Sequence, residues 1–478
     1  MGGTISERVG AACRSAFVGI FVVAVASFVG ILSTPSLAAN ANDYSVIAGG
    51  GSGSVPSVTG TASTSTSLND PEGVVVDPSG NLLICDTNNN EIEVLATSAS
   101  NPGYTLATGV SWVIGNLYVI VQGGDSPATP SIAGTSGLST ELNTPTGLGL
   151  DAEGNVIISD TGVGEVLVLA VSATNPGYEM TSWTRGNVYV VAGNGSSTPT
   201  PTSAGSSATT IGLIQPTGVA IDHQGNILVS DSGSAIVAVV AVSASNPGYP
   251  LVSGARWTVG DLYPVAGGGS QSPSSSGSAS MGVGLGDPAG LAIDESGNVA
   301  IADVNDNEVD LLAISATNPG FAGVPTWSKG DLYTIAGSGT NAPTNAGANG
   351  LASVLQDPQG IAFDRSGDVL IADTNADGID VLAETGSGPG FPVPSNVSLI
   401  AGDLYLIAGG GTSRPTTSAE SSLAAQLNHP FGIAAAEDGE LYIADTDDRA
   451  IDEFQLAPSA PTLLSATANE SSVQLTWS

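Results

Sequence analysis

The sequence predicts an all-β fold, a six-bladed β-propeller made of four-stranded antiparallel blades. Three observations support this prediction. A Pro-x-Gly phrase recurs six times at a nearly constant interval, short apolar runs separated by turn residues follow each copy, and a further apolar phrase also occurs six times. Self-similarity at a fixed period marks a repeat architecture, in which each unit buries its apolar surface against its neighbours.

The repeats begin at six prolines spaced 70 to 74 residues apart, namely Pro71, Pro145, Pro216, Pro288, Pro358 and Pro430. In the copy at Pro216, short apolar runs predict strands over residues 218–222, 227–230, 236–242 and 261–266. Gly, Asn, Asp and Pro residues separate these runs, and they are the residues that form turns. Four short strands repeated six times are typical of a propeller.

The two ends of the repeat array predict how the ring closes. The fourth-strand phrase begins at Tyr118, Tyr189, Tyr263, Tyr333 and Tyr405, and we match it to a sixth copy beginning at Tyr44, before the first Pro-x-Gly. The last repeat has three expected strands and no fourth. We therefore expect the N-terminal strand near residues 44–48 to complete the last blade and close a propeller over residues 43–457, which pairs otherwise open edges.

The repeats resemble a known family in their detailed phrasing. The segments "HPFGIAAAEDGELYIADTDDRAI" and "DPQGIAFDRSGDVLIADTNADGI" are similar to the NHL repeat, and "DLYTIAGSGT" is similar to fourth strands of exported bacterial NHL propellers. The resemblance implies a propeller that acts as a binding surface, a sensor domain or occasionally a lyase. The basic residue usual before the third strand in that family is replaced here by Glu91, Glu165, Glu308 and Gly378.

The charge balance argues against a nucleic-acid partner. Lys and Arg number 8 and Asp and Glu number 44, which gives a net charge of −36. Such a charge repels phosphate backbones.

The N-terminus predicts an export signal over residues 1–41. Arg8 and Arg14 flank an apolar run over residues 16–32, and small residues allow cleavage after Ala38 or Ala41. The alternative is a retained anchor, which would be the chain's one contact with a membrane, although the run is short for a span. We expect a secreted or cell-surface protein.

The C-terminal segment, residues 458–478, resembles the opening of a fibronectin type III domain. Pro458 and Pro461 match its lead-in and Trp477 its second strand. About two strands are present, too few for a sandwich, so we expect the truncated start of such a domain. The alternative is a disordered tail, because the segment is rich in Ser, Ala and Thr.

One set of candidate ligand-binding residues lies in the long loops between third and fourth strands. It consists of the aromatic residues Tyr104, Tyr178, Tyr249, Phe321 and Phe391. Flat rings offer stacking area to a glycan or a peptide. The alternative is that each ring packs between blades or fixes its own loop.

A calcium site is the candidate metal centre, and no other cofactor is expected. Asp373, Asn375 and Asp377 alternate ahead of Gly378, and Glu384 completes the spacing of a calcium-binding loop. Glu384 ends a strand and no helices flank the loop, so the expectation is a looser site of Asp373, Asn375 and Asp377. The alternative is that aspartates at turns accept hydrogen bonds from their own backbone.

Three functions follow from these features. The first is a secreted, non-catalytic NHL propeller that binds a protein or glycan or acts as a scaffold. The second is a calcium-dependent enzyme of the lyase or lactonase type, which a ring of carboxylates facing an axial cavity would favour. The related amidating lyases hold zinc with several histidines, whereas this chain has only His223 and His429. The third is an extracellular sensor or adhesion domain of an anchored protein.

Overall fold

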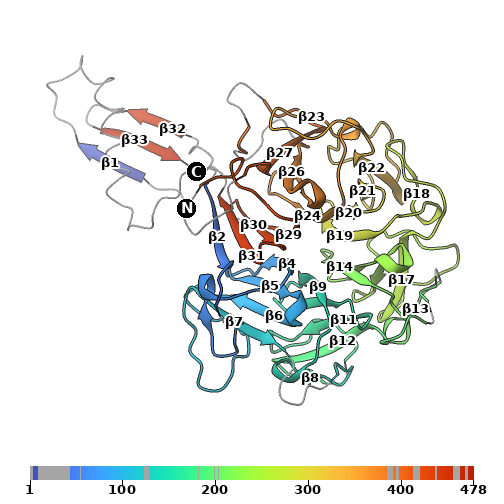
Figure 1. Ribbon diagram of the computed structural model, residues 1–478. Coiled ribbons are helices and arrows are strands. Elements are labelled where there is room, and N and C mark those ends of the chain that lie inside the picture. The colour runs from blue at the N-terminus through green and yellow to red at the C-terminus, as the bar shows by residue number, and fades with distance from the viewer. Residues whose placement is uncertain are drawn as a thin grey trace. The chain divides into compact units, whose positions relative to one another are not determined.

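The computed structural model divides into a propeller, Asn42–Leu456, and a second unit of Met1–Ala41 with Ala457–Ser478. The structure describes residues 4–8, 43–53, 55–122, 129–180, 182–198, 200–202, 204–384, 391–393, 398–412, 420–436, 439–455, 463–468 and 472–477. Six sheets surround a common centre (Figure 1). The predicted all-β, six-bladed propeller is therefore confirmed.

The first strands of the blades begin at the six repeated prolines. They are β4 (Pro71–Val76), β9 (Pro145–Leu150), β14 (Pro216–Ile221), β19 (Pro288–Ile293), β24 (Pro358–Phe363) and β29 (Pro430–Ala435). The second strands are β5 (Leu82–Asp86), β10 (Val156–Asp160), β15 (Ile227–Asp231), β20 (Val299–Asp303), β25 (Val369–Asp373) and β30 (Glu440–Asp445). Each first strand contacts the first strands of both neighbouring blades, so these strands form the inner wall of the ring.

The third and fourth strands continue each sheet outward. The third strands are β6 (Glu91–Leu95), β11 (Glu165–Leu169), β16 (Ile236–Val240), β21 (Glu308–Leu312), β26 (Gly378–Leu382) and β31 (Ala450–Gln455). The fourth strands are β7 (Asn116–Val121), β12 (Asn187–Gly193), β17 (Asp261–Gly267), β22 (Asp331–Gly337), β27 (Asp403–Gly409) and β2 (Asp43–Gly49).

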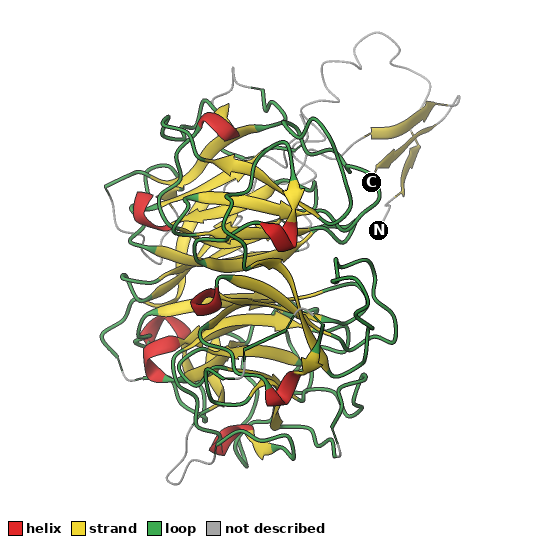
Figure 2. Cartoon of the chain, turned by 90° about the vertical axis from the view of Figure 1, so that its right-hand side faces the viewer, coloured by secondary structure: helices red, strands yellow, loops and turns green. Residues whose placement is uncertain are grey.

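A fifth, two-residue strand edges every blade, which the sequence did not predict. These strands are β3 (Thr61–Ala62), β8 (Thr135–Ser136), β13 (Ser206–Ser207), β18 (Ser278–Ala279), β23 (Ala348–Asn349) and β28 (Glu420–Ser421). Short 3-10 turns lie between strands (Figure 2): η2 (Ser63–Ser65), η3 (Thr87–Asn89), η4 (Gly137–Ser139), η5 (Ala208–Thr210), η6 (Ser232–Ser234), η7 (Ser280–Gly282), η8 (Gly350–Ala352) and η9 (Thr374–Ala376).

The N-terminal strand β2 closes the ring by pairing with β31 in the sixth blade, as predicted. The register differs by one residue from the sequence match. Tyr44 lies opposite Phe454, in the position that Leu262 occupies opposite Val240 in the third blade. Its buried hydroxyl donates a hydrogen bond to Asp452 Oδ2 at 2.9 Å. Tyr44 is therefore a core residue of the closing strand and not an equivalent of Tyr263.

The hydrophobic core lies between blades. One cluster, for example, joins Leu311 and Ile335 of the fourth blade to Val369 and Ile371 of the fifth. Polar bonds supplement this packing where the second strand ends, because Thr374 Oγ1 donates to the carbonyl of Pro430 in the next blade at 2.7 Å. The apolar side chains on the faces of each sheet thus pack against those of the neighbouring blade.

The second unit contains a three-stranded sheet of β1 (Thr4–Arg8), β33 (Ser472–Trp477) and β32 (Leu463–Ala468). Of the predicted export signal, residues 1–3 and 9–41 lie outside the described residues. The described part of the chain contains no helix long and apolar enough to span a membrane.

Candidate functional site

The six glycines of the Pro-x-Gly phrases make the closest contacts between successive blades. A Cβ atom on any of them would lie 2.1–2.5 Å from the carbonyl oxygen of the x residue in the next blade. They are Gly73, Gly147, Gly218, Gly290, Gly360 and Gly432. Only a residue without a side chain permits this approach, so the repeated glycine sets the narrow bore of the ring.

The axial cavity inside this ring measures about 80 Å³, room for a few water molecules. Glu72, Thr146, Thr217, Gln359 and Phe431 line it, and Glu72 is its one ionisable side chain among the described residues. Burial, with a smaller contribution from Asp70, raises the pKa of Glu72 to about 7. The described lining of this cavity therefore holds one carboxylate and not a ring of them.

The turn aspartates are bound within their own loops. Asp77 Oδ1 accepts hydrogen bonds from the backbone N–H groups of Ser79 and Asn81, at 2.7 and 2.9 Å. Asn81 Nδ2 donates to Asp77 Oδ2 at 2.8 Å. The same bonds recur at Asp151, Asp222 and Asp294. The turn-forming alternative is thus confirmed for these residues.

The structure buries all five aromatic residues that the sequence offered as a ligand-binding rim, and we correct that interpretation. Their exposed fractions are 3–6% for Tyr104, Tyr178, Tyr249, Phe321 and Phe391. The three tyrosines also donate their hydroxyls to the turn aspartates Asp77, Asp151 and Asp222 at 2.8–3.0 Å. The three tyrosines therefore fix the long loops and offer no open ring face to a ligand. Phe321 packs in the core and also lines a pocket between two blades.

Stacked rings complete this loop anchor. In the first blade, Trp112 stacks on Tyr118 with ring centroids 5.3 Å apart and on Tyr104 at 6.3 Å. A Cβ on Gly60, in the linker between blades, would lie 2.3 Å from the Tyr118 ring. Similar stacks occur in the second and third blades. Offset stacking therefore holds the long loop against its own blade.

The three residues of the predicted calcium loop each have partners within the protein. Asp373 Oδ1 accepts from the backbone N–H of Gln356 at 2.5 Å. Asn375 donates its amide to Asp357, and Asp377 Oδ1 accepts from the backbone N–H of His429 in the next blade at 3.0 Å. In this arrangement Asp377 links two blades.

A pocket of about 270 Å³ opens between the fourth and fifth blades, and its lining includes Phe321, one of the aromatic residues that the sequence analysis named as candidate ligand-binding residues. The fourth blade contributes Asp294, Glu295, Ser296 and the loop Pro319, Gly320 and Phe321, and the fifth contributes Arg365, Ser366, Gly367 and Glu384. It combines an apolar wall with several charged and hydroxyl groups. Concave sites with a few convergent polar groups are typical of ligand pockets.

The pocket exists because the fifth blade departs from its own repeat. A Cβ on Gly103 would meet Val171 of the next blade at 3.1 Å, and one on Gly177 would meet Val242 at 3.5 Å. A Cβ on Gly320 would meet nothing within 4 Å. Glu384 occupies the position of those valines in the fifth blade, because its N–H and theirs bond to equivalent residues after the first turn.

Glu384 gives the pocket its most unusual chemistry. Its Oε2 accepts a hydrogen bond from the backbone N–H of Ala322 at 3.1 Å, while Oε1 is buried with no partner among the described residues. Burial, and secondarily the charge of Asp368, raises the pKa of Glu384 to about 8. The carboxyl group is therefore mostly protonated at neutral pH, and a strongly shifted group in a pocket is a candidate functional group.

A second departure from the repeat lies in the first turn of the fifth blade. Asp368 stands where the other turns have Asn81, Asn155, Asn226 and Asn298, so Asp364 loses the amide donor of those turns. Phe391 cannot supply the hydroxyl that Tyr104 gives to Asp77. Burial and then the charge of Asp368 raise the pKa of Asp364 to about 6. Comparing the repeats position by position would have revealed both substitutions in the sequence.

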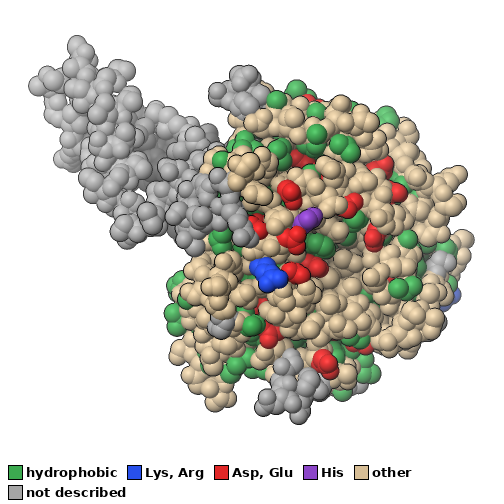
Figure 3. All heavy atoms as spheres, in the orientation of Figure 1, with side chains coloured by type: hydrophobic (Ala, Val, Ile, Leu, Met, Phe, Trp, Pro, Cys, Tyr) green, Lys and Arg blue, Asp and Glu red, His purple; other side chains and the backbone are tan. Residues whose placement is uncertain are grey.

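Acidic side chains gather around the middle of the face of the ring shown in Figure 3. This distribution agrees with the net charge of −36. The field of such a face repels anionic polymers and attracts cations.

Comparison with known proteins supports the fold. The family model for the NHL repeat matches residues 68–95, in the first blade. The chain is thus a six-bladed propeller that carries an NHL repeat. No curated protein matches it in sequence.

Among solved structures, the chain is similar to a structural genomics protein of unknown function from Bacteroides thetaiotaomicron. The TM-score is 0.51 at 14% identity, over 86% of this chain and 75% of that one. It is also similar to an auxiliary nutrient binding protein from Bacteroides ovatus, with a TM-score of 0.48 at 12% identity over 87% and 76%. A gluconolactonase from Xanthomonas campestris gives 0.42 at 12% identity over 81% and 88%. These likenesses concern the fold alone.

Proposed function

We propose that this protein is a secreted or cell-surface, non-catalytic binding module, and that the pocket between the fourth and fifth blades takes one sugar residue of a glycan. The observation that carries the proposal is the pocket itself, a cavity of about 270 Å³ at the place where the repeats depart from each other. Apolar packing fills the equivalent position in the first two blades.

The lining suits a sugar ring. Arg365 and Glu295 offer charged donors and acceptors, and Ser296 of the fourth blade and Ser366 of the fifth also line the pocket. Neighbouring hydroxyls of a sugar can each accept and donate, so they pair with planar, bidentate groups such as guanidinium and carboxylate. The protonated carboxyl group of Glu384 adds a donor beside an acceptor in the same pocket.

The experiment is a screen of the purified full chain against immobilised oligosaccharides, followed by calorimetry on the best ligand. We expect Arg365→Ala to weaken binding at least tenfold. The matched control is Arg256→Ala, which removes an exposed arginine outside the pocket and is expected to leave affinity unchanged. Equal loss in both variants would place binding elsewhere, and a screen without ligands would exclude the glycan class in favour of a protein partner.

An enzyme of the lyase or lactonase type is the second candidate, and the raised pKa of Glu384 favours it. A carboxyl group with a pKa near 8 keeps a proton at pH 7 that it could donate to a leaving group. Incubation of the chain with small lactones, with and without Ca²⁺, would show turnover by NMR. Product formation at the same rate in Glu384→Gln would reject this role.

Export itself is tested by the mass of the mature N-terminus. Cleavage after Ala38 or Ala41 would support secretion. An intact N-terminus would favour the sensor or adhesion domain of an anchored protein.

A further inference from the structure

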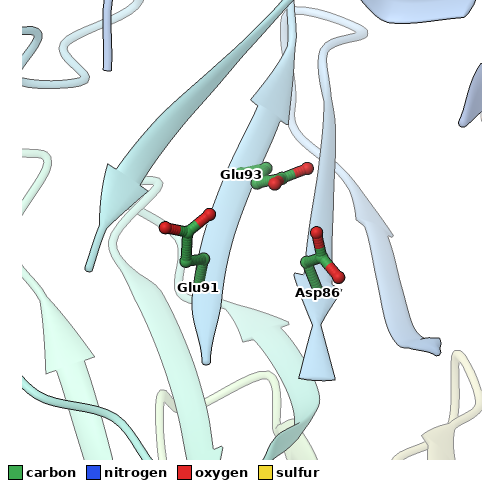
Figure 4. A group of neighbouring side chains, drawn as sticks. All are labelled: Asp86, Glu91 and Glu93. Carbon is green, nitrogen blue, oxygen red and sulfur yellow. The ribbon is translucent and has the colours of Figure 1, made fainter. Parts of the chain in front are cut away.

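Three carboxyl groups converge inside the first blade. Asp86 ends β5, and Glu91 and Glu93 lie on the neighbouring strand β6, where Asp86 is paired with Glu91 and Ile84 with Glu93. Because side chains alternate along a strand, all three carboxylates lie on one face of the sheet. Figure 4 shows them grouped across the two strands.

The group has the size of a cation site. Each residue offers one oxygen, and these oxygens lie within 4.8 Å of one another. Two oxygens that share a Ca²⁺ ion at about 2.4 Å each can lie up to about 4.8 Å apart. Among the described residues, Asp86, Glu91 and Glu93 form the one group of three His, Cys, Asp or Glu residues whose ligand atoms all lie within 4.8 Å of one another.

The burial of Glu93 is a second, independent indication that a cation balances the charge of this group. Glu93 is fully buried, with 0% of its surface exposed, and neither of its carboxylate oxygens accepts a hydrogen bond from an N–H or hydroxyl group among the described residues. The group within hydrogen-bonding reach of Glu93 is the Asp86 carboxyl, which is itself an acid. A buried carboxylate without a hydrogen bond or counter-charge is costly. The Oε2 atom of Glu91 also has no partner there, while Asp86 accepts from Asn69 N at 2.7 Å and from Asn89 Nδ2 at 2.8 Å.

The fourth blade shows how the same fold provides a partner internally. Glu308 corresponds to Glu91 by strand register, and its Oε2 accepts a hydrogen bond from the Thr334 hydroxyl at 3.0 Å. In the first blade Val119 occupies the position of Thr334 and supplies no hydroxyl. The fourth blade carries acids at the same three positions, and both oxygens of Asp310, the equivalent of Glu93, are also buried without a partner among the described residues. The first blade differs because Glu91 Oε2 lacks the hydroxyl donor that Glu308 has, and because its three carboxylates offer oxygens within 4.8 Å of one another.

We propose that Asp86, Glu91 and Glu93 bind one Ca²⁺ ion inside the first blade. Hard oxygen ligands from carboxylates are those that Ca²⁺ takes, and water can complete its shell from the side of Glu91, which is only partly buried. The ion would compensate the buried charges and tie β5 to β6. This site is separate from the pocket between the fourth and fifth blades, so either can fail without the other.

The test is calorimetric titration of the EDTA-treated full chain with CaCl₂. We expect one equivalent of Ca²⁺ to bind and the melting temperature to rise by several degrees, because the ion binds the folded state. Glu93→Gln should abolish both effects. Asp310→Asn, the equivalent change in the fourth blade, and Asp377→Asn, in the predicted calcium loop, should retain both.

Folding of the variants is checked in EDTA, where Glu93→Gln should melt no lower than the wild type because it removes a buried acid. If that variant does not fold, Glu91→Gln at the open side of the group replaces it and should weaken Ca²⁺ binding at least tenfold. Absence of Ca²⁺ binding by the wild type would overturn the proposal and indicate that the carboxyl groups hold protons instead. Binding that persists in the folded Glu93→Gln variant, or disappears only in Asp377→Asn, would also overturn it.

Discussion

Replacing Gly218 with alanine tests the account of the inner ring. The new Cβ would lie 2.2 Å from the carbonyl oxygen of Ala289 in the next blade and 3.0 Å from Ser230 Oγ. Real Cβ contacts essentially never fall below 3.0 Å, so the backbones of two blades must separate by about 0.8 Å. Strain of this kind in a packed core costs about 1–3 kcal/mol.

Chain entropy acts in the opposite direction. Gly218 does not have a positive φ, and alanine at an unstrained strand position is favoured over glycine by about 0.5–1 kcal/mol. The two arguments therefore predict opposite signs, and the steric one is larger. We expect Gly218→Ala to lower the free energy of unfolding by about 1–2 kcal/mol.

Urea denaturation followed by tryptophan fluorescence measures this change. The control is Gly282→Ala, because a Cβ there meets nothing within 4 Å. That variant should gain about 0.4–1 kcal/mol from the lower entropy of its unfolded chain. A Gly218→Ala protein as stable as the wild type would show that close packing of successive first strands does not require the glycine.

Three further predictions follow from single contacts. Tyr44→Phe removes the hydroxyl that donates to Asp452, and should cost about 1–2 kcal/mol in urea denaturation, whereas an unchanged midpoint would contradict the role of that bond in ring closure. Because folding raises the pKa of Glu384 from 4.5 to about 8, its contribution to stability is complete below about pH 4.5 and is lost as the pH rises through 8. Melting curves from pH 5 to pH 9 should show this loss in the wild type and a smaller one in Glu384→Gln; an equal slope in both would refute it. Asp368→Asn restores the amide found in the other turns beside Asp364, and should stabilise the protein at pH 8 by about 1 kcal/mol, with a smaller gain at pH 5, where the carboxyl groups are closer to neutral.

The sequence analysis did not predict the pocket at Glu384, and the reason is physical. Glu384 was read as part of a calcium loop pattern, because it lies eleven residues after Asp373. Its actual environment comes from Gly320 and Ala322 of the neighbouring blade, more than sixty residues earlier. A motif reports neighbours along the chain, whereas a pocket between blades depends on neighbours across it.

The aromatic residues also show that a sequence pattern does not determine which side chains are buried. Their regular spacing identified the long loops correctly, but spacing alone does not distinguish a ring that faces solvent from one that packs. Tyr104 became a core residue because its hydroxyl reaches Asp77 and its loop folds back on Trp112. The packing alternative describes these residues, and Phe321 both packs in the core and lines the pocket between the fourth and fifth blades.

The sequence by itself determined the architecture, because the repeat period, the turn residues and the Pro-x-Gly phrase act locally in every copy. It also determined closure by the N-terminal strand, since the last repeat lacked a fourth strand. Tertiary structure decided the register of Tyr44, the burial of the aromatic rings, the pocket at Glu384 and the convergence of Glu93 with Asp86. Each of these depends on which side chains meet across two strands or two blades, and strand register and blade packing set that pairing.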